Sequence, residues 1–244
     1  MRIVGLGLWD RCNFAFRTNV KPVSIITYNL NENFMKTLAK ISTLSFLLLF
    51  LISGIKLQAQ DPTVVLGGLE WMTTNLDVAT FRNGDAIPEV KTAKEWKKAG
   101  EAGTPAWCYY ENSPSYGFSV GGANGRLYNW YALTDPRGLA PEGWRIPEKA
   151  DWEKITNIYG DNRARLYNDL IKGGISGFEV ILAGRRHPKG EFEYFETYTT
   201  MWTSSLTDDG KSTYYMEFNP QWPIAGMREG MKGTGSYVRC VKVK

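Results

Sequence analysis

Histidine and cysteine are scarce in this sequence, which contains one histidine, His187, and three cysteines among 244 residues. A zinc site needs three or four histidine, cysteine or carboxylate ligands, and a Ser-His-Asp triad needs a histidine next to its nucleophile. His187 precedes Pro188 in a stretch that is typical of a polar hairpin loop. We therefore predict no catalytic residues and no metal site.

Clustered basic residues are also lacking. The net charge is +4, but residues 1–59 contain seven basic residues and only two acidic ones, so the remainder is close to neutral. Phosphate contacts dominate the affinity of proteins for nucleic acids, and they require clustered lysine and arginine. Nucleic acid is therefore not an expected partner.

No hydrophobic run is long enough for a transmembrane helix, which needs about 20 apolar residues. The longest, Ile41–Ile55, is shorter and is interrupted by a serine and a glycine near its end. Two lysines precede it and the small residue Ala59 follows it, which is the layout of a secretory signal peptide. We predict a signal peptide over Met35–Ala59, cleaved before Gln60, with a retained anchor as the alternative.

Residues 1–34 are polar and unpatterned, although a signal peptide normally begins the chain. We expect translation to start at Met35, with an unusually long leading segment as the alternative. Cleavage would leave residues 60–244 as a single domain without a membrane span. We expect this domain to be secreted, periplasmic or held at the cell surface.

Two cysteines, Cys108 and Cys240, remain after the predicted cleavage. Disulfides persist in oxidising compartments, and an even number of cysteines favours pairing. We predict a Cys108–Cys240 disulfide. The alternative is two separately buried thiols.

Helix and strand signals fall in different parts of the domain, which predicts the α+β class. Helices are expected in three segments: from the cap at Thr92 to about Ala99, ended by Gly100; Pro147–Tyr159, ended by Gly160; and Asn162–Lys172. Strands are expected at 64–66, 69–72, 178–182, 192–195, 201–204, 213–218 and 236–242, the later ones as a meandering antiparallel sheet. Residues 112–125 are rich in glycine, serine and asparagine and are expected to form a loop.

Aromatic residues are abundant, and eight tryptophans follow the predicted cleavage site. Large apolar side chains are mostly buried, so most of these tryptophans are expected to lie in the core. Trp222 is the exception, because Pro220 and Pro223 bracket it in a polar loop between two expected strands.

Several segments together resemble one family, the Fibrobacter succinogenes major paralogous domain. The resemblance rests on Gly67–Leu76, Phe81–Pro88, Trp107–Tyr110, Gly125–Ala132, Gly138–Pro147, Trp202–Ser205 and Val238–Lys242, and it covers nearly all of the domain. It implies a secreted or surface-associated protein and no particular biochemical activity.

Part of the same pattern resembles the formylglycine-generating enzyme group. The shared features are Gly143–Pro147, Ala150–Glu153, Trp202–Ser204 and Arg239-Cys240. This resemblance implies a C-type-lectin-like fold. The tract after the Trp152 helix is shorter than the family pattern, and the chain ends in Val243-Lys244 where an acidic residue is common. Both departures leave ligand specificity open.

We predict a non-catalytic binding module whose ligand is a glycan or a protein partner. The expected ligand-binding residues lie on late strands and loops: Tyr198, Trp202, Glu217, Trp222 and Arg228. A structural component of the cell envelope is the alternative. An oxidase of the formylglycine-generating type is disfavoured, because Cys240 matches a structural position of that group and the required reactive cysteine pair is missing.

No cofactor is predicted. Calcium would require a cluster of carboxylate and amide oxygens. Asp208-Asp209 and Asp161-Asn162 are the local candidates, but turn and helix-cap roles explain them better. The sugar-binding triplets Glu-Pro-Asn and Trp-Asn-Asp of calcium-dependent lectins are absent from the sequence.

Overall fold

The computed structural model describes residues 62–115 and 124–243, which belong to one compact unit spanning Ala59–Lys244. The predicted signal peptide Met35–Ala59, the cleavage site before Gln60 and residues 1–34 lie outside the described residues. Within the described part, no helix is both long and apolar enough to cross a membrane.

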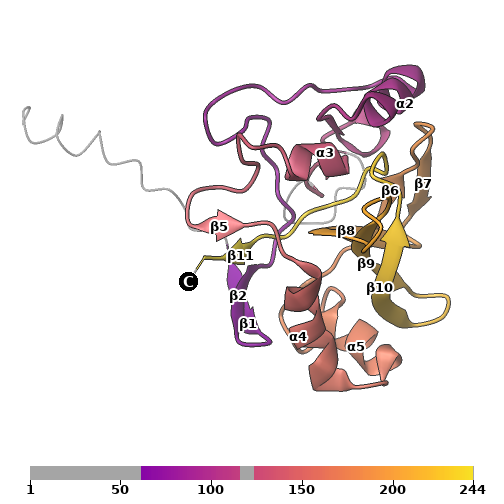
Figure 1. The fold of residues 1–244 in the computed structure, drawn as a ribbon. Coiled ribbons are helices and arrows are strands. Elements are labelled where there is room, and N and C mark those ends of the chain that lie inside the picture. The colour runs from indigo at the N-terminus through magenta and orange to yellow at the C-terminus, as the bar shows by residue number, and fades with distance from the viewer. Residues whose placement is uncertain (1–61, 116–123, 244) are drawn as a thin grey trace, which may run out of the picture. The chain divides into compact units, whose positions relative to one another are not determined.

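The described residues form two main sheets, a short ribbon and four α-helices (Figure 1), which confirms the α+β class. The strand orders are β1-β2-β11-β5, β10-β9-β8-β6-β7 and β3-β4. The helices are α2 (Ala93–Ala102), α3 (Trp130–Leu133), α4 (Lys149–Tyr159) and α5 (Arg163–Leu170), with a 3-10 turn at Tyr110–Asn112. The strands are β1 (Thr63–Leu66), β2 (Leu69–Met72), β3 (Trp107–Cys108), β4 (Leu127–Tyr128), β5 (Trp144–Arg145), β6 (Ala183–Arg186), β7 (Phe192–Phe195), β8 (Thr199–Leu206), β9 (Thr213–Asn219), β10 (Ile224–Gly230) and β11 (Val241–Lys242).

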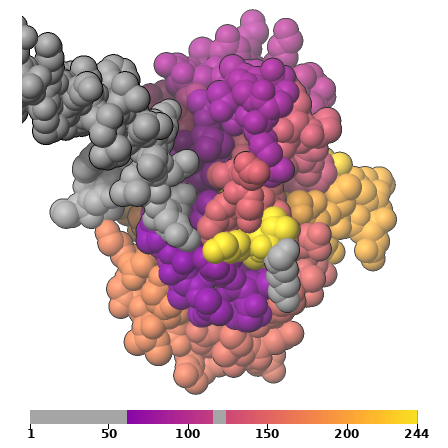
Figure 2. All heavy atoms as spheres, turned by 90° about the vertical axis from the view of Figure 1, so that its left-hand side faces the viewer, coloured from indigo at the N-terminus to yellow at the C-terminus, as the bar shows by residue number. Residues whose placement is uncertain are grey.

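The first sheet joins the two ends of the domain. The predicted hairpin around Gly67 is confirmed, with Leu66 opposite Leu69. Strand β11 then pairs with β2 through Val241 and Trp71, and with β5 on its other side. Figure 2 shows the yellow β11 lying against the purple β1–β2 hairpin.

Helix α2 begins as predicted but ends later. Thr92 accepts a hydrogen bond from the Glu95 backbone N–H at 3.2 Å. The predicted end at Gly100 is wrong, because the helix continues to a cap at Gly103, whose φ of +67° is a left-handed conformation that glycine adopts readily. Gly100 serves close packing instead, since a Cβ there would lie 3.2 Å from the Cα of Gly233.

Helices α4 and α5 are confirmed, with small shifts at their ends. The backbone N–H of Glu148 donates to Asp151 at 2.8 Å at the start of α4. Burial acts to raise the pKa of Asp151, but hydrogen bonds from Arg145 and Glu148 hold it below its usual value. Helix α5 ends at Leu170, two residues before the predicted end, because the chain turns there and Ile171 forms a bridge with Val180.

The predicted strand 178–182 is wrong. Phe178 and Val180 are buried, but Glu179 has a φ of +60° that breaks the extended backbone. The carbonyl oxygens of Phe178 and Glu179 accept hydrogen bonds from the guanidinium of Arg239 instead of from a neighbouring strand. A side chain far along the sequence therefore replaces the strand pairing.

The five-stranded sheet contains the predicted strands β7, β8 and β9, and two strands that were not predicted, β6 and β10. It is not a simple antiparallel meander, because β6 and β8 are parallel at Gly184 and Thr199. Of the predicted strand 236–242, only Val241–Lys242 is a strand. Ser236 bridges Tyr128 and Tyr237 bridges Met201, so this segment crosses between other strands.

Helices α4 and α5 cover one face of the five-stranded sheet. Met201, Met216 and Phe218 point from that face into a core cluster that also contains Trp152 and Leu166. Trp71 of the other sheet joins the same cluster, with its ring 4.8 Å from that of Trp152. The two sheets are thereby linked by aromatic packing. On the opposite face of the five-stranded sheet, Trp202 and Tyr215 pack into a second core cluster.

The predicted disulfide is absent, because Cys108 and Cys240 are both buried as thiols. They belong to different core clusters, Cys108 with Trp96 and Cys240 with Tyr128. Burial raises the pKa of Cys108 to about 11, so its thiol stays protonated at neutral pH. The structure therefore has two separately buried thiols, which was the alternative to the predicted disulfide.

Candidate functional site

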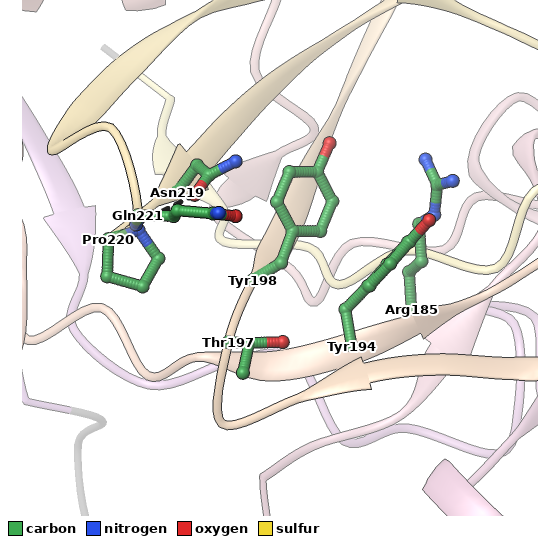
Figure 3. A pocket seen from close by; sticks show the side chains of 7 residues that line it. All are labelled: Arg185, Tyr194, Thr197, Tyr198, Asn219, Pro220 and Gln221. Carbon is green, nitrogen blue, oxygen red and sulfur yellow. Dashed lines mark hydrogen bonds between the residues drawn. The ribbon is translucent and has the colours of Figure 1, made fainter.

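A hollow of about 650 Å³ lies where two turns of the five-stranded sheet meet. The β7–β8 turn and the β9–β10 turn form two of its walls, and strand β6 contributes the side chain of Arg185. Figure 3 shows the side chains of Arg185 and Tyr194 on one side of Tyr198, with the β9–β10 turn on the other. The lining residues are Arg185, Tyr194, Thr197, Tyr198, Asn219, Pro220 and Gln221.

Tyr194, near the end of β7 where the β7–β8 turn begins, has an unusual backbone conformation. Tyr194 and Glu196 both have a φ near +60°, which is uncommon for residues other than glycine. The backbone carbonyl of Tyr194 accepts hydrogen bonds from the N–H groups of Thr197 and Tyr198, at 3.1 and 3.0 Å. The turn is thus fixed, and it presents a tyrosine ring that is 51% exposed. Strained backbone of this kind gathers at functional sites.

Arg185 lies beside the two tyrosine rings. Its guanidinium carbon is 5.2 Å from the ring centre of Tyr194 and 5.5 Å from that of Tyr198. Its Nε donates to Glu193 at 3.0 Å. Burial acts to lower the pKa of Arg185, but the hydrogen bond to Glu193 and the nearby acidic groups raise it overall, so the side chain stays charged. Among the described residues, its two terminal nitrogens have no hydrogen-bond acceptor and remain available to a ligand.

Three of the predicted binding residues form one connected network on the sheet. The hydroxyl of Tyr198 donates to Glu217 at 3.2 Å, and the other oxygen of Glu217 lies 2.6 Å from Nε of Arg228. Burial raises the pKa of Tyr198, and Tyr215 and Glu217 add to the shift, so the phenol stays a hydrogen-bond donor. Only Tyr198 lines the hollow; Glu217 and Arg228 lie beside it.

The two predicted tryptophans have opposite environments. Trp222 is 64% exposed and follows Gln221 in the β9–β10 turn, at the rim of the hollow. Trp202 has no exposed surface, and its indole N–H donates to the carbonyl of Tyr128 at 2.8 Å. Trp202 is therefore a core residue, and its assignment to a ligand-binding surface is corrected.

The sequence pattern over residues 64–242 matches the profile of the Fibrobacter succinogenes major domain. The chain belongs to this family. Comparison with curated proteins and with solved structures finds no match. Every residue that lines the hollow falls inside the segment that matches this Fibrobacter domain.

Other candidates named from the sequence have local roles within this Fibrobacter domain. Asp209 accepts hydrogen bonds from Thr207 and Lys211 in the β8–β9 turn, and Asn162 caps helix α5. His187 lies in the β6–β7 turn, where its Nδ1 accepts from the Lys189 N–H at 3.2 Å. Within residues 62–115 and 124–243, no three histidine, cysteine or carboxylate groups gather as a metal ion would require.

Sequence reasoning missed most of the hollow. Arg185 and Tyr194 are separated by a turn and carry no motif, so only the pairing of β6 with β7 brings them together. Asn219 could have been predicted, because it begins the polar, proline-containing turn from which the exposure of Trp222 was predicted.

Proposed function

We propose that this chain is an exported, non-catalytic module that binds a glycan in the hollow between the β7–β8 and β9–β10 turns. The exposed ring of Tyr194, held by a left-handed backbone above a fixed turn, is the observation that carries the proposal. An isolated exposed aromatic residue is ordinary. One that is held in a costly conformation at the edge of a hollow favours a binding role.

The chemistry of the lining suits a sugar. Aromatic rings offer flat apolar faces, and Tyr194 and Tyr198 lie with their ring centres 5.5 Å apart. Asn219, Gln221 and Thr197 add amide and hydroxyl groups, which both donate and accept hydrogen bonds. Pockets that bind small molecules combine such apolar surfaces with a few polar groups.

Export supports a glycan ligand and depends on the signal peptide predicted at Met35–Ala59. We place the domain outside the cytoplasm, in the periplasm or at the cell surface, and we propose no requirement for calcium or another cofactor. A role in envelope assembly is the second candidate. The position of β10 at the edge of its sheet favours it, because an edge strand can pair with another chain.

A formylglycine-generating type of oxidation is not supported. That chemistry requires reactive thiolates, whereas Cys108 is buried with a raised pKa and Cys240 belongs to a different core cluster. We propose that the fold is nevertheless a C-type-lectin variant, as the shared Gly143–Pro147 and Ala150–Glu153 segments imply. An experimental structure superposed on lectin domains would test this relation.

A pair of glycine substitutions tests the site. Y194G should lower glycan affinity at least tenfold while leaving the melting temperature unchanged or higher, because glycine adopts a φ near +60° without steric cost. E196G is the matched control, since it relieves the same conformation in the same turn without removing a lining side chain. Isothermal titration and thermal unfolding of both variants give the comparison. Equal affinity in the wild type and Y194G would contradict the proposed site.

A further inference from the structure

We infer that the ligand is a linear, uncharged polysaccharide that lies along a groove extending from the β7–β8 turn to helix α2. This inference rests on the proposed function, because it extends the same site and names the class of glycan. It goes beyond a single sugar pocket: the structure contains three hollows in series, and each shares a lining residue with the next.

Arg185 connects the first hollow to the second, which has a volume of about 260 Å³. Strand β9 runs past both, with Asn219 lining the first and Tyr215 lining the second. These residues are an even number of positions apart and therefore face the same side of the sheet, at a separation of about 13 Å. Pro188 connects the second hollow to the third, of about 250 Å³, which is bordered by Lys97 and Glu101 of α2.

Glycines shape the second and third hollows. A Cβ on Gly230 would lie 2.5 Å from the ring of Tyr215, so the glycine leaves room for this ring against strand β10. Gly100 and Gly233 bring α2 close to the loop before β11, and both line the third hollow. Met231 lines the second hollow with 57% of its surface exposed, which offers an apolar contact. Alternating apolar and polar surfaces therefore continue beyond the first hollow.

Charges of both signs line or border this groove. Arg185 lies 3.0 Å from Glu193 and Lys97 lies 3.6 Å from Glu101, while beside the first hollow Arg228 lies 2.6 Å from Glu217. Glu229 in the second hollow and Lys189 in the third add one charge of each sign. A polyanion would therefore meet a carboxylate for each cation along the groove. Hydroxyl groups both donate and accept hydrogen bonds, so an uncharged sugar chain can use both members of each pair. Charge pairing therefore favours a neutral polysaccharide over an acidic one.

The test is the dependence of affinity on chain length. Isothermal titration of the full chain would use linear β-1,4- and α-1,4-linked gluco-oligosaccharides and β-1,4-linked xylo-oligosaccharides of two, four and six units. At least one series should gain tenfold or more in affinity from two to six units. M231A should reduce affinity for six units several-fold and leave affinity for two units unchanged. I175A, which alters another exposed apolar residue that lines none of the three hollows, is the control.

The outcomes separate this inference from the proposed function. Binding that is independent of chain length, or equal in M231A and wild type for six units, would overturn the groove and leave the first hollow as the site. Affinity that falls steeply between 50 and 500 mM NaCl would overturn the uncharged ligand, because salt screens interactions between charges. Binding of no glycan, with binding of an extended peptide instead, would overturn both proposals.

Discussion

Replacing Arg239 by leucine is expected to lower the free energy of unfolding by about 3–5 kcal/mol. The Arg239 guanidinium is buried and donates to Asn75 at 3.0 Å, to Glu179 at 2.7 Å and to the carbonyl of Phe178. Each buried acceptor that loses its donor costs about 1–3 kcal/mol. R239K should also destabilise the protein, because an ammonium cannot reproduce the planar fork that reaches all three oxygens.

Guanidinium chloride unfolding of the full chain, followed by tryptophan fluorescence, measures this effect. R165L is the matched control, since Arg165 is exposed in helix α5 and makes two long contacts, an ion pair of 3.6 Å with Asp169 and an approach of 5.9 Å to the ring centre of Tyr159. Its effect should stay within about 0.5 kcal/mol. If R239L cost less than about 1 kcal/mol, Arg239 would not be holding the 178–180 segment in place.

The second large effect is expected at Trp202. W202A should cost about 3–5 kcal/mol, because it removes a fully buried indole and leaves a cavity beside Tyr215. W222A should change the stability by no more than about 0.5 kcal/mol, since Trp222 is exposed in a turn. The same variant should weaken glycan affinity by a factor of about 2–10, as the loss of one aromatic contact does.

These two tryptophans separate stability from binding in one experiment. Thermal unfolding and isothermal titration would be carried out on both variants. Only W202A should lower the melting temperature, and only W222A should weaken the glycan affinity. A stable W202A variant with reduced affinity would restore Trp202 to the binding surface and contradict its assignment to the core.

Elements with strong local signals were predictable from the sequence. Thr92 and Glu95 mark the start of α2 by their spacing, and Asn162 marks that of α5 by its capping side chain. The hairpin at Gly67 follows from turn chemistry. These features depend on neighbouring residues alone, so a local pattern is sufficient to identify them.

Features that depend on distant contacts were not predictable. Gly100 has the pattern of a helix terminator, but its neighbour Gly233 explains it better. Phe178 to Leu182 alternates like a strand, and only the guanidinium of Arg239 shows where its carbonyl groups are bound. The exposure of Trp222 was predictable from the prolines that bracket it, whereas the burial of Trp202 depends on distant contacts, among them the carbonyl of Tyr128 and the ring of Tyr215.

The candidate site was predictable only in part, because some of its residues are brought together by distant contacts. Tyr198, Glu217 and Arg228 were predicted from their positions on late strands and loops, and hydrogen bonds and an ion pair connect them in the structure. Arg185 and Tyr194 gave no signal, because the pairing of β6 with β7 and the left-handed turn create their environment. Cys108 and Cys240 met the conditions of parity and compartment, but the fold buries them in separate clusters.

The most direct test of the central claim is a thermal-shift screen of the full chain against soluble neutral and acidic polysaccharides, with and without calcium. A ligand at 100 times its dissociation constant adds about 2.7 kcal/mol to the stability, which is a readable rise in melting temperature. We predict a rise with at least one neutral polysaccharide, independent of calcium and abolished in Y194G. No rise with any polysaccharide would contradict a glycan-binding module and favour the role in envelope assembly.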